Sequence, residues 1–155
     1  MCFIESLKQG RLGEYAIRDC LERQPWVRQV IDLSLDKRHQ EKDIDIMIEN
    51  LSHQFVTAEI KTDLQAHQTG NLAYEVSTSG NIGCLEKTEA DWIIFYVPEN
   101  NTAYVLITER LRDYVNQHRD SWKEIPMGDY SLGYLLSISE LNYHKIIHKT
   151  LKEVI

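Results

Sequence analysis

The sequence predicts one α/β domain, residues 1–155, in which helices flank a mixed β-sheet. Three observations favour this fold class: an N-terminal segment with helical spacing, three following segments with the pattern of strands, and a continuous apolar run at Trp92–Val97. A chain of 155 residues with 43% hydrophobic residues can fill one core. With 7 Gly and 3 Pro, it does not have the composition of a disordered chain.

A helix is predicted over residues 3–24, and Pro25 ends it. At alternating steps of four and three residues, one stripe of this helix contains Phe3, Leu7, Gly10, Glu14, Ile17 and Leu21. Glu14 is the unexpected member, because a carboxylate on an apolar stripe must be paired or bound to a metal ion. The alternative is that Glu14 lies at the solvated edge of the stripe, as most lone acids on helices do.

Three strands are predicted after this helix. Val30–Leu35 alternates apolar and polar residues, as a half-buried strand does. Ile44–Ile48 and Phe55–Lys61 are the second and third strands, and Asn50–His53 forms the turn between them. These three strands supply the first part of the sheet.

The rest of the chain adds further strands and helices to this core. Trp92–Val97 is predicted as a buried strand, because it is apolar without alternation. From Ser139 the chain is predicted to be helical to its end, with Leu141, Ile147 and Leu151 on or near one face. The other predicted elements are a strand at Asn71–Ser77, a short helix at Leu85–Ala90, a strand at Ala103–Ile107, a helix capped by Thr108 that runs to His118, and a strand at Gly133–Ile138.

Composition excludes several functional classes. The 17 Lys and Arg against 24 Asp and Glu give a net charge of −7, which argues against a protein that coats nucleic acid by bulk charge. No apolar stretch approaches the roughly 20 residues of a membrane-spanning helix, and no signal peptide is visible. Cys2, Cys20 and Cys84 are odd in number and widely spaced, which favours a reducing cytoplasm.

Asp45 and Glu59 form the strongest candidate site. Their midpoint is residue 52, inside the predicted turn, so a hairpin of that register places the two carboxylates opposite each other. Opposed residues have Cβ atoms about 4.5–5.5 Å apart, which lets both acids bind one cation. Lys61 lies two residues beyond Glu59 and therefore on the same face. About one acid-X-Lys triplet is expected by chance in such a chain, so the triplet alone is weak evidence. Its position, on a strand that pairs with the strand of Asp45, is what points to a site.

This arrangement resembles the PD-(D/E)XK nuclease superfamily. The residues that carry the resemblance are Gly13-Glu14, Ile44-Asp45-Ile46-Met47-Ile48 and Ala58-Glu59-Ile60-Lys61-Thr62, within residues 10–97. The resemblance implies the restriction-endonuclease-like fold, with an αβββαβ core and C-terminal strand and helix additions. The segments Thr69–Glu75 and Lys87–Trp92 are similar to those of a phage and bacterial branch of this superfamily.

By this resemblance, Asp45, Glu59 and the Ile60 carbonyl would bind Mg²⁺, for which Mn²⁺ would substitute. Glu14 would assist from the helix, and Lys61 would position the attacking water. Ile44 stands where the superfamily has proline, and Asp43 is a rival for Asp45. Only about nine residues separate Lys61 from the next strand, which indicates an inserted strand and leaves the roles of three residues open, namely Gln65, Gln68 and Glu75.

The expected function is therefore metal-dependent DNA endonuclease activity, in which a homodimer would cut both strands. The first alternative is a catalytically inactive nucleic-acid-binding or assembly protein that retains the fold. The second is an unrelated α/β protein in which Asp45, Glu59 and Lys61 form a surface network. A zinc site at His144 and His148, four residues apart, is disfavoured because no third ligand is spaced nearby.

Overall fold

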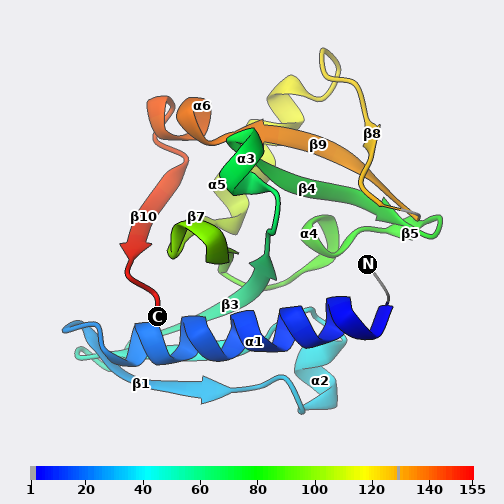
Figure 1. The fold of residues 1–155 in the computed structure, drawn as a ribbon. Helices are drawn as coiled ribbons and strands as arrows, with labels where there is room; N and C mark the ends of the chain where they lie inside the picture. Colours follow the sequence, from blue (N-terminus) through cyan, green and yellow to red (C-terminus); the bar gives the residue numbers. More distant parts are fainter. Residues whose placement is uncertain (1–2, 129) are drawn as a thin grey trace.

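The computed structural model describes residues 3–128 and 130–155 and contains two β-sheets with helices around them (Figure 1). Its elements in chain order are α1 (Phe3–Glu22), β1 (Val27–Asp32), α2 (Lys37–Gln40), β2 (Ile46–Asn50), β3 (Phe55–Thr62), α3 (Ala66–Thr69), β4 (Asn71–Thr78), β5 (Asn81–Ile82), α4 (Cys84–Lys87), β6 (Trp92–Val97), η1 (Pro98–Asn100), β7 (Thr102–Ile107), α5 (Thr108–His118), β8 (Ile125–Pro126), β9 (Ser131–Ser137), α6 (Ile138–Tyr143) and β10 (Ile147–Lys152).

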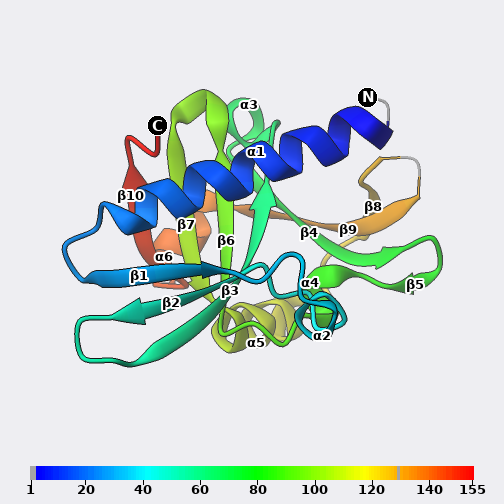
Figure 2. The same ribbon diagram turned by 90° about the horizontal axis from the view of Figure 1, so that it is seen from below.

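The larger sheet has six strands in the order β1-β2-β3-β6-β7-β10. It is mixed, because β3 pairs with β6 in parallel and the other neighbours are antiparallel. Helix α1 crosses one face of this sheet (Figure 2). The predicted mixed sheet flanked by helices is therefore confirmed.

The apolar run at β6 is explained by burial on both faces of the sheet. Ile94 and Tyr96 pack in the cluster that contains the inward residues of α1. Ile93 and Phe95 pack on the other face, with residues of α5 and of the second sheet. A strand covered on both sides has no solvent face, so its sequence does not alternate.

The second sheet has four strands in the order β5-β4-β9-β8. Strand β4 is predicted correctly as a strand, and it lies in this second sheet, where it pairs with β9. It is inserted between β3 and its parallel neighbour β6. The expected crossover helix is reduced to α4, four residues long instead of the predicted Leu85–Ala90.

Helix α1 presents a slightly different face to the sheet from the predicted stripe. Ile17 and Leu21 are fully buried as predicted, whereas Leu7 is 54% exposed. The inward line instead passes through Gly13, where an added Cβ would collide with Thr62 Oγ1 of β3. Glu14, one residue further on, consequently lies at the half-buried edge of this face.

The C-terminal segment is not the continuous helix that the spacing predicts. Helix α6 ends near Lys145, which has φ of +56°. The chain then forms β10, antiparallel to β7, and Leu151 and Val154 enter the core beside α1. The helical spacing of Leu141, Ile147 and Leu151 was a coincidence, because tertiary pairing outweighs local preference in a short segment.

Two smaller predictions were also wrong. The first strand covers Val27–Asp32 instead of Val30–Leu35, and Leu35 is 84% exposed. At α5 the N-cap position is Ile107, and Thr108 makes no capping hydrogen bond. Within the described residues, no helix is both long and apolar enough to cross a membrane.

Candidate active site

The β2–β3 hairpin has the predicted register as far as Ile46, which pairs with Ala58. Asp45 lies directly before β2, next to the part of β3 that carries Glu59. The Asp45 N–H donates to the Ala58 carbonyl at 3.0 Å, and the Ile60 N–H donates to Asp45 Oδ2 at 2.7 Å. The Asp45 side chain is thus bound to the strand that carries Glu59.

Glu59 and Lys61 form an ion pair on the face of β3 opposite Ala58 and Ile60. The Lys61 Nζ lies 2.6 Å from Glu59 Oε1. Glu59 is only 5% exposed, and its burial raises its pKa to about 8. The charge of Lys61 lowers this pKa and the charge of Asp45 raises it further. Burial works against the charge of Lys61, but the adjacent Glu59 outweighs it and raises the pKa of Lys61. Lys61 is therefore a cation, suited to orienting a water and unsuited to deprotonating it.

Glu14 approaches Asp45 from α1. Both side chains line a pocket of about 300 Å³, together with Arg11, Arg18 and Asp32. Burial, followed by the charges of Asp45 and Asp32, raises the pKa of Glu14 to about 7. Burial likewise raises the pKa of Asp45, against the Ile60 hydrogen bond and Lys61. Glu14 is thus a half-buried acid that lines the same pocket as Asp45. It is neither fully inside the apolar face of the helix nor at its solvated edge.

Asp32 is a site residue that the sequence reasoning missed. It accepts hydrogen bonds from the Ser34 N–H and hydroxyl, at 2.9 and 2.6 Å, and from Arg18 at 2.9 Å. The available signal was its alternation with Ile31 and Leu33, which marks the polar face of the strand but does not distinguish a site residue.

Asp43, the sequence rival of Asp45, is directed elsewhere. Its φ is +50°, and its carboxylate pairs with Lys87 of α4 at 3.2 Å.

The two zinc candidates lie on different elements, since His144 follows α6 and His148 lies on β10. Trp26 and Trp92 are in edge-on contact, with ring centroids 6.1 Å apart.

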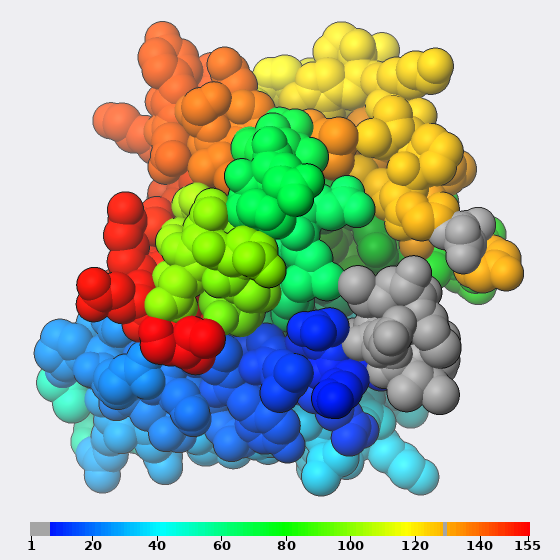
Figure 3. Space-filling model, in the orientation of Figure 1, coloured from blue at the N-terminus to red at the C-terminus, as the bar shows by residue number. Residues whose placement is uncertain are grey.

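A second cavity, of about 590 Å³, is lined in part by Lys61. Its lining includes Gln65 and Glu75, two residues whose roles the sequence left open, together with Cys84. Figure 3 shows a recess between the green surface around α3 and β4 and the orange surface of β8. Gln68, the third such residue, is exposed and does not line this cavity.

The donor atoms of Asp45 and Glu59 fit a hard divalent cation. Glu59 is buried and Asp45 is half-buried, and burial raises the pKa of both carboxyl groups, so a cation beside them would stabilise their ionised forms. The N–H and C=O of one strand residue point the same way, so the Ile60 carbonyl is directed to the side of Asp45. Among the residues that the structure describes, no three His, Cys, Asp or Glu side chains gather closely enough to hold a metal ion. Mg²⁺ commonly uses one or two carboxylates and completes its shell with water and substrate oxygens.

Comparison with known proteins adds one structural likeness. No protein-family model matches the chain, and no curated protein matches it. A solved structure described as that of a bacterial homing endonuclease, I-Ssp6803I, is similar with a TM-score of 0.50 and 16% sequence identity. The similarity covers 67% of this chain and 70% of that chain. It shows a shared, nuclease-like fold and supports no closer assignment.

Proposed function

We propose that this protein is a metal-dependent DNA endonuclease of the PD-(D/E)XK type, built as one domain. The observation that supports the proposal is the β2–β3 hairpin, in which the Ile60 N–H donates to Asp45 Oδ2 at 2.7 Å and Lys61 Nζ lies 2.6 Å from Glu59 Oε1. Neighbouring carboxylates repel each other and Glu59 is only 5% exposed, so we infer that the two acids bind a cation. The shared fold with a structure described as a homing endonuclease supports the same conclusion.

Each site residue has a distinct role in this proposal. Asp45, Glu59 and the Ile60 carbonyl would hold Mg²⁺ or Mn²⁺, and Glu14 would contribute through its carboxylate. The bound cation would neutralise charge on the phosphate and lower the pKa of a bound water. The Lys61 ammonium would orient that water and stabilise the oxygen that becomes more negative in the transition state.

A catalytically inactive DNA-binding or assembly protein is the competing proposal. A protein that has lost nuclease activity does not need the two acids and the lysine. The Lys61–Glu59 ion pair therefore favours an active nuclease over an inactive binding protein. Cleavage of both strands of a duplex requires two such sites, and we propose a homodimer for that purpose.

The test is a cleavage assay with matched variants. Linear duplex, single-stranded, flap and four-way-junction DNA are incubated with Mg²⁺ or Mn²⁺, because the preferred structure is unknown. Asp45→Asn should abolish cleavage and metal binding, whereas Asp43→Asn should keep both, because Asp43 is turned toward Lys87. Lys61→Met should lower kcat on the order of 100-fold with nearly unchanged DNA affinity. Lys152→Met, at an exposed strand position, is its control.

The outcomes separate the two proposals. The enzyme is supported if the wild type cleaves DNA, Asp45→Asn abolishes this cleavage and Lys61→Met strongly reduces it. Binding of DNA without cleavage of any substrate supports the inactive protein. Neither binding nor cleavage would contradict both proposals and leave an ordinary surface network.

A further inference from the structure

We propose that Cys84 and Glu75 are positioning residues that hold the Lys61 ammonium from the side opposite Glu59. This inference rests on the proposed nuclease function and adds two residues to its site. It assigns a purpose to Glu75 and to a half-buried thiol that no structural role explains.

A shared cavity and a hydrogen bond connect the three side chains. Lys61, Cys84 and Glu75 line the same cavity of about 590 Å³. The Cys84 thiol donates to Glu75 Oε2 at 3.8 Å, and the Thr78 hydroxyl donates to the same oxygen at 3.4 Å. Lys61 favours the ionised form of the Cys84 thiol, although burial outweighs it and raises the pKa of Cys84. Lys61 thus pairs with Glu59 at 2.6 Å and shares a cavity with Cys84 and Glu75.

A close approach of α4 to β4 creates this arrangement. The Gly83 N–H donates to the Val76 carbonyl at 2.8 Å. A Cβ at Gly83 would lie 2.5 Å from the Glu75 carbonyl oxygen, so only glycine permits the approach. The next residue is Cys84, whose side chain is carried to Glu75 and Lys61 by this contact.

The chemistry of the three groups fits a positioning role. An ammonium has three N–H donors and Glu59 uses one of them, so a second acceptor restricts the rotation of the group. The Cys84 sulfur can accept from Lys61 while its S–H donates to Glu75, because a thiol is a weak donor and a weak acceptor. Holding the ammonium in one place matters for a group that acts only in the transition state.

Kinetics with conservative and disruptive variants test the proposal. Cys84→Ala should lower kcat about 10-fold with KM within about 2-fold, because the ammonium is misplaced while DNA contacts remain. Cys84→Ser should restore most of kcat, since a hydroxyl also accepts and donates. Glu75→Gln should lower kcat less than Cys84→Ala. The control is Cys20→Ser, a buried cysteine of α1 outside the cavity.

Two results would overturn the proposal. One is Cys84→Ala with the kcat of the wild type. The other is Cys84→Ser as impaired as Cys84→Ala at equal thermal stability, which would indicate packing alone.

An alkylation experiment tests the contacts without any nuclease activity. With Cys2→Ser and Cys20→Ser, Cys84 is the only thiol, and the pH dependence of its alkylation by iodoacetamide reports its ionisation. The charged groups that face Cys84 are Lys61, Glu75 and Glu59. Lys61→Met should move the midpoint to higher pH and Glu75→Gln to lower pH, whereas Lys87→Met, on the same helix but paired with Asp43, should leave it unchanged.

This second experiment separates the two levels of inference. Shifted midpoints in a protein that cleaves no DNA would support the contacts while the nuclease proposal fails. Unshifted midpoints in an active nuclease would overturn the positioning role and leave the nuclease proposal intact.

Discussion

Glu59 is the residue at which burial and charge oppose each other most strongly. It is 5% exposed and has Asp45 as a close acidic neighbour, and Lys61 is its one ion-pair partner among the described residues. The pKa of this acid is raised to about 8, because burial and the charge of Asp45 outweigh the stabilising effect of Lys61 on the carboxylate. A divalent cation would lower this pKa by stabilising the carboxylate.

The stability of metal-free protein should therefore depend on pH. The folded pKa values of about 8 for Glu59 and about 7 for Glu14 exceed the usual unfolded value of about 4.3. The folded state then binds more protons than the unfolded state between about pH 4.3 and 8, so the free energy of unfolding falls as the pH rises through that window. One proton gives a slope of about 1.4 kcal/mol per pH unit at most.

Urea unfolding in EDTA from pH 5 to 9 measures this slope, and Glu59→Gln should flatten it. A stability that does not change with pH across this window, in EDTA, would show that the two acids are already ionised in the folded protein.

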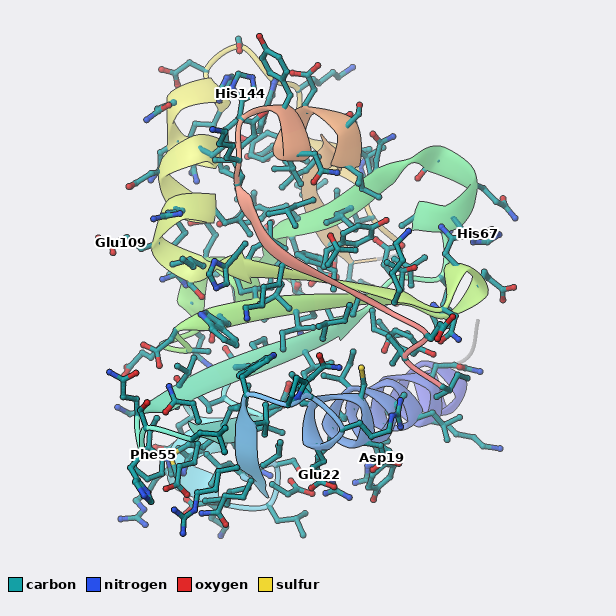
Figure 4. The ribbon with its side chains drawn as sticks, turned by 90° about the vertical axis from the view of Figure 1, so that its left-hand side faces the viewer. Asp19, Glu22, Phe55, His67, Glu109 and His144 are labelled. Carbon is teal, nitrogen blue, oxygen red and sulfur yellow. The ribbon has the colours of Figure 1, made fainter. Side chains whose placement is uncertain are left out.

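Glu14 is the second residue whose role can be isolated. Glu14→Gln should reduce cleavage on the order of 100-fold while largely keeping stability, because the amide matches the carboxylate in shape. The matched control is Glu22→Gln, because Glu22 projects from the outer side of the same helix, away from the sheet (Figure 4). Nuclease assays that give equal losses for both variants would place Glu14 outside the site.

At the scale of elements, the contact between α1 and β3 determines where Glu14 lies. Gly13→Ala adds a Cβ that collides with Thr62 Oγ1, so the helix must move away from β3. We expect a net loss of about 1–2 kcal/mol, since overpacking outweighs the gain in helix propensity. Cleavage should also fall, because Glu14 moves with the helix.

Gly10→Ala is the control for this prediction, because its Cβ meets no atom within 4 Å on the same helix. It should stabilise the protein by about 0.5–1 kcal/mol. Chemical denaturation measures both variants, and a Gly13→Ala protein as stable as Gly10→Ala would contradict the close approach.

Strand β10 is the element that closes the sheet beside β7. Leu151 is buried there with Val154, in the cluster that includes α1 residues. Leu151→Ala should cost about 2–4 kcal/mol of unfolding free energy, as truncation of a core leucine does. Lys152→Ala, at the next and exposed position, should change stability by less than about 0.5 kcal/mol. Equal effects in thermal unfolding would argue that this segment is not a core strand.

At the scale of the whole molecule, metal binding should be visible as stability. A cation that binds only the folded state at ten times its Kd adds about 1.4 kcal/mol, which raises the Tm by about 3–6 °C for a chain of this size. Differential scanning calorimetry at pH 8 with and without Mg²⁺ or Mn²⁺ measures the shift. Asp45→Asn should lose the shift and Asp43→Asn should keep it. A wild-type Tm unaffected by millimolar Mg²⁺ and Mn²⁺ would exclude the metal site.

The sequence by itself determined the local parts of the site. The 14-residue spacing between Asp45 and Glu59 and the turn at its midpoint define the hairpin register, because a hairpin forms from neighbouring residues. The period of two also places Lys61 on the face of Glu59, and the apolar run at Trp92–Val97 marks a strand buried on both sides. These features depend on residues close together in the chain.

Only the tertiary structure decided those features of the fold and the site that depend on contacts between segments far apart in the sequence. It moved β4 into a second sheet, turned the predicted C-terminal helix into β10, and selected the line through Gly13 as the inward face of α1. It also brought Cys84 and Glu75 to the cavity of Lys61, across 23 and 14 residues of sequence respectively. Short segments such as residues 147–152 have weak local preferences, so the free energy of burial and strand pairing with distant partners determines their conformation.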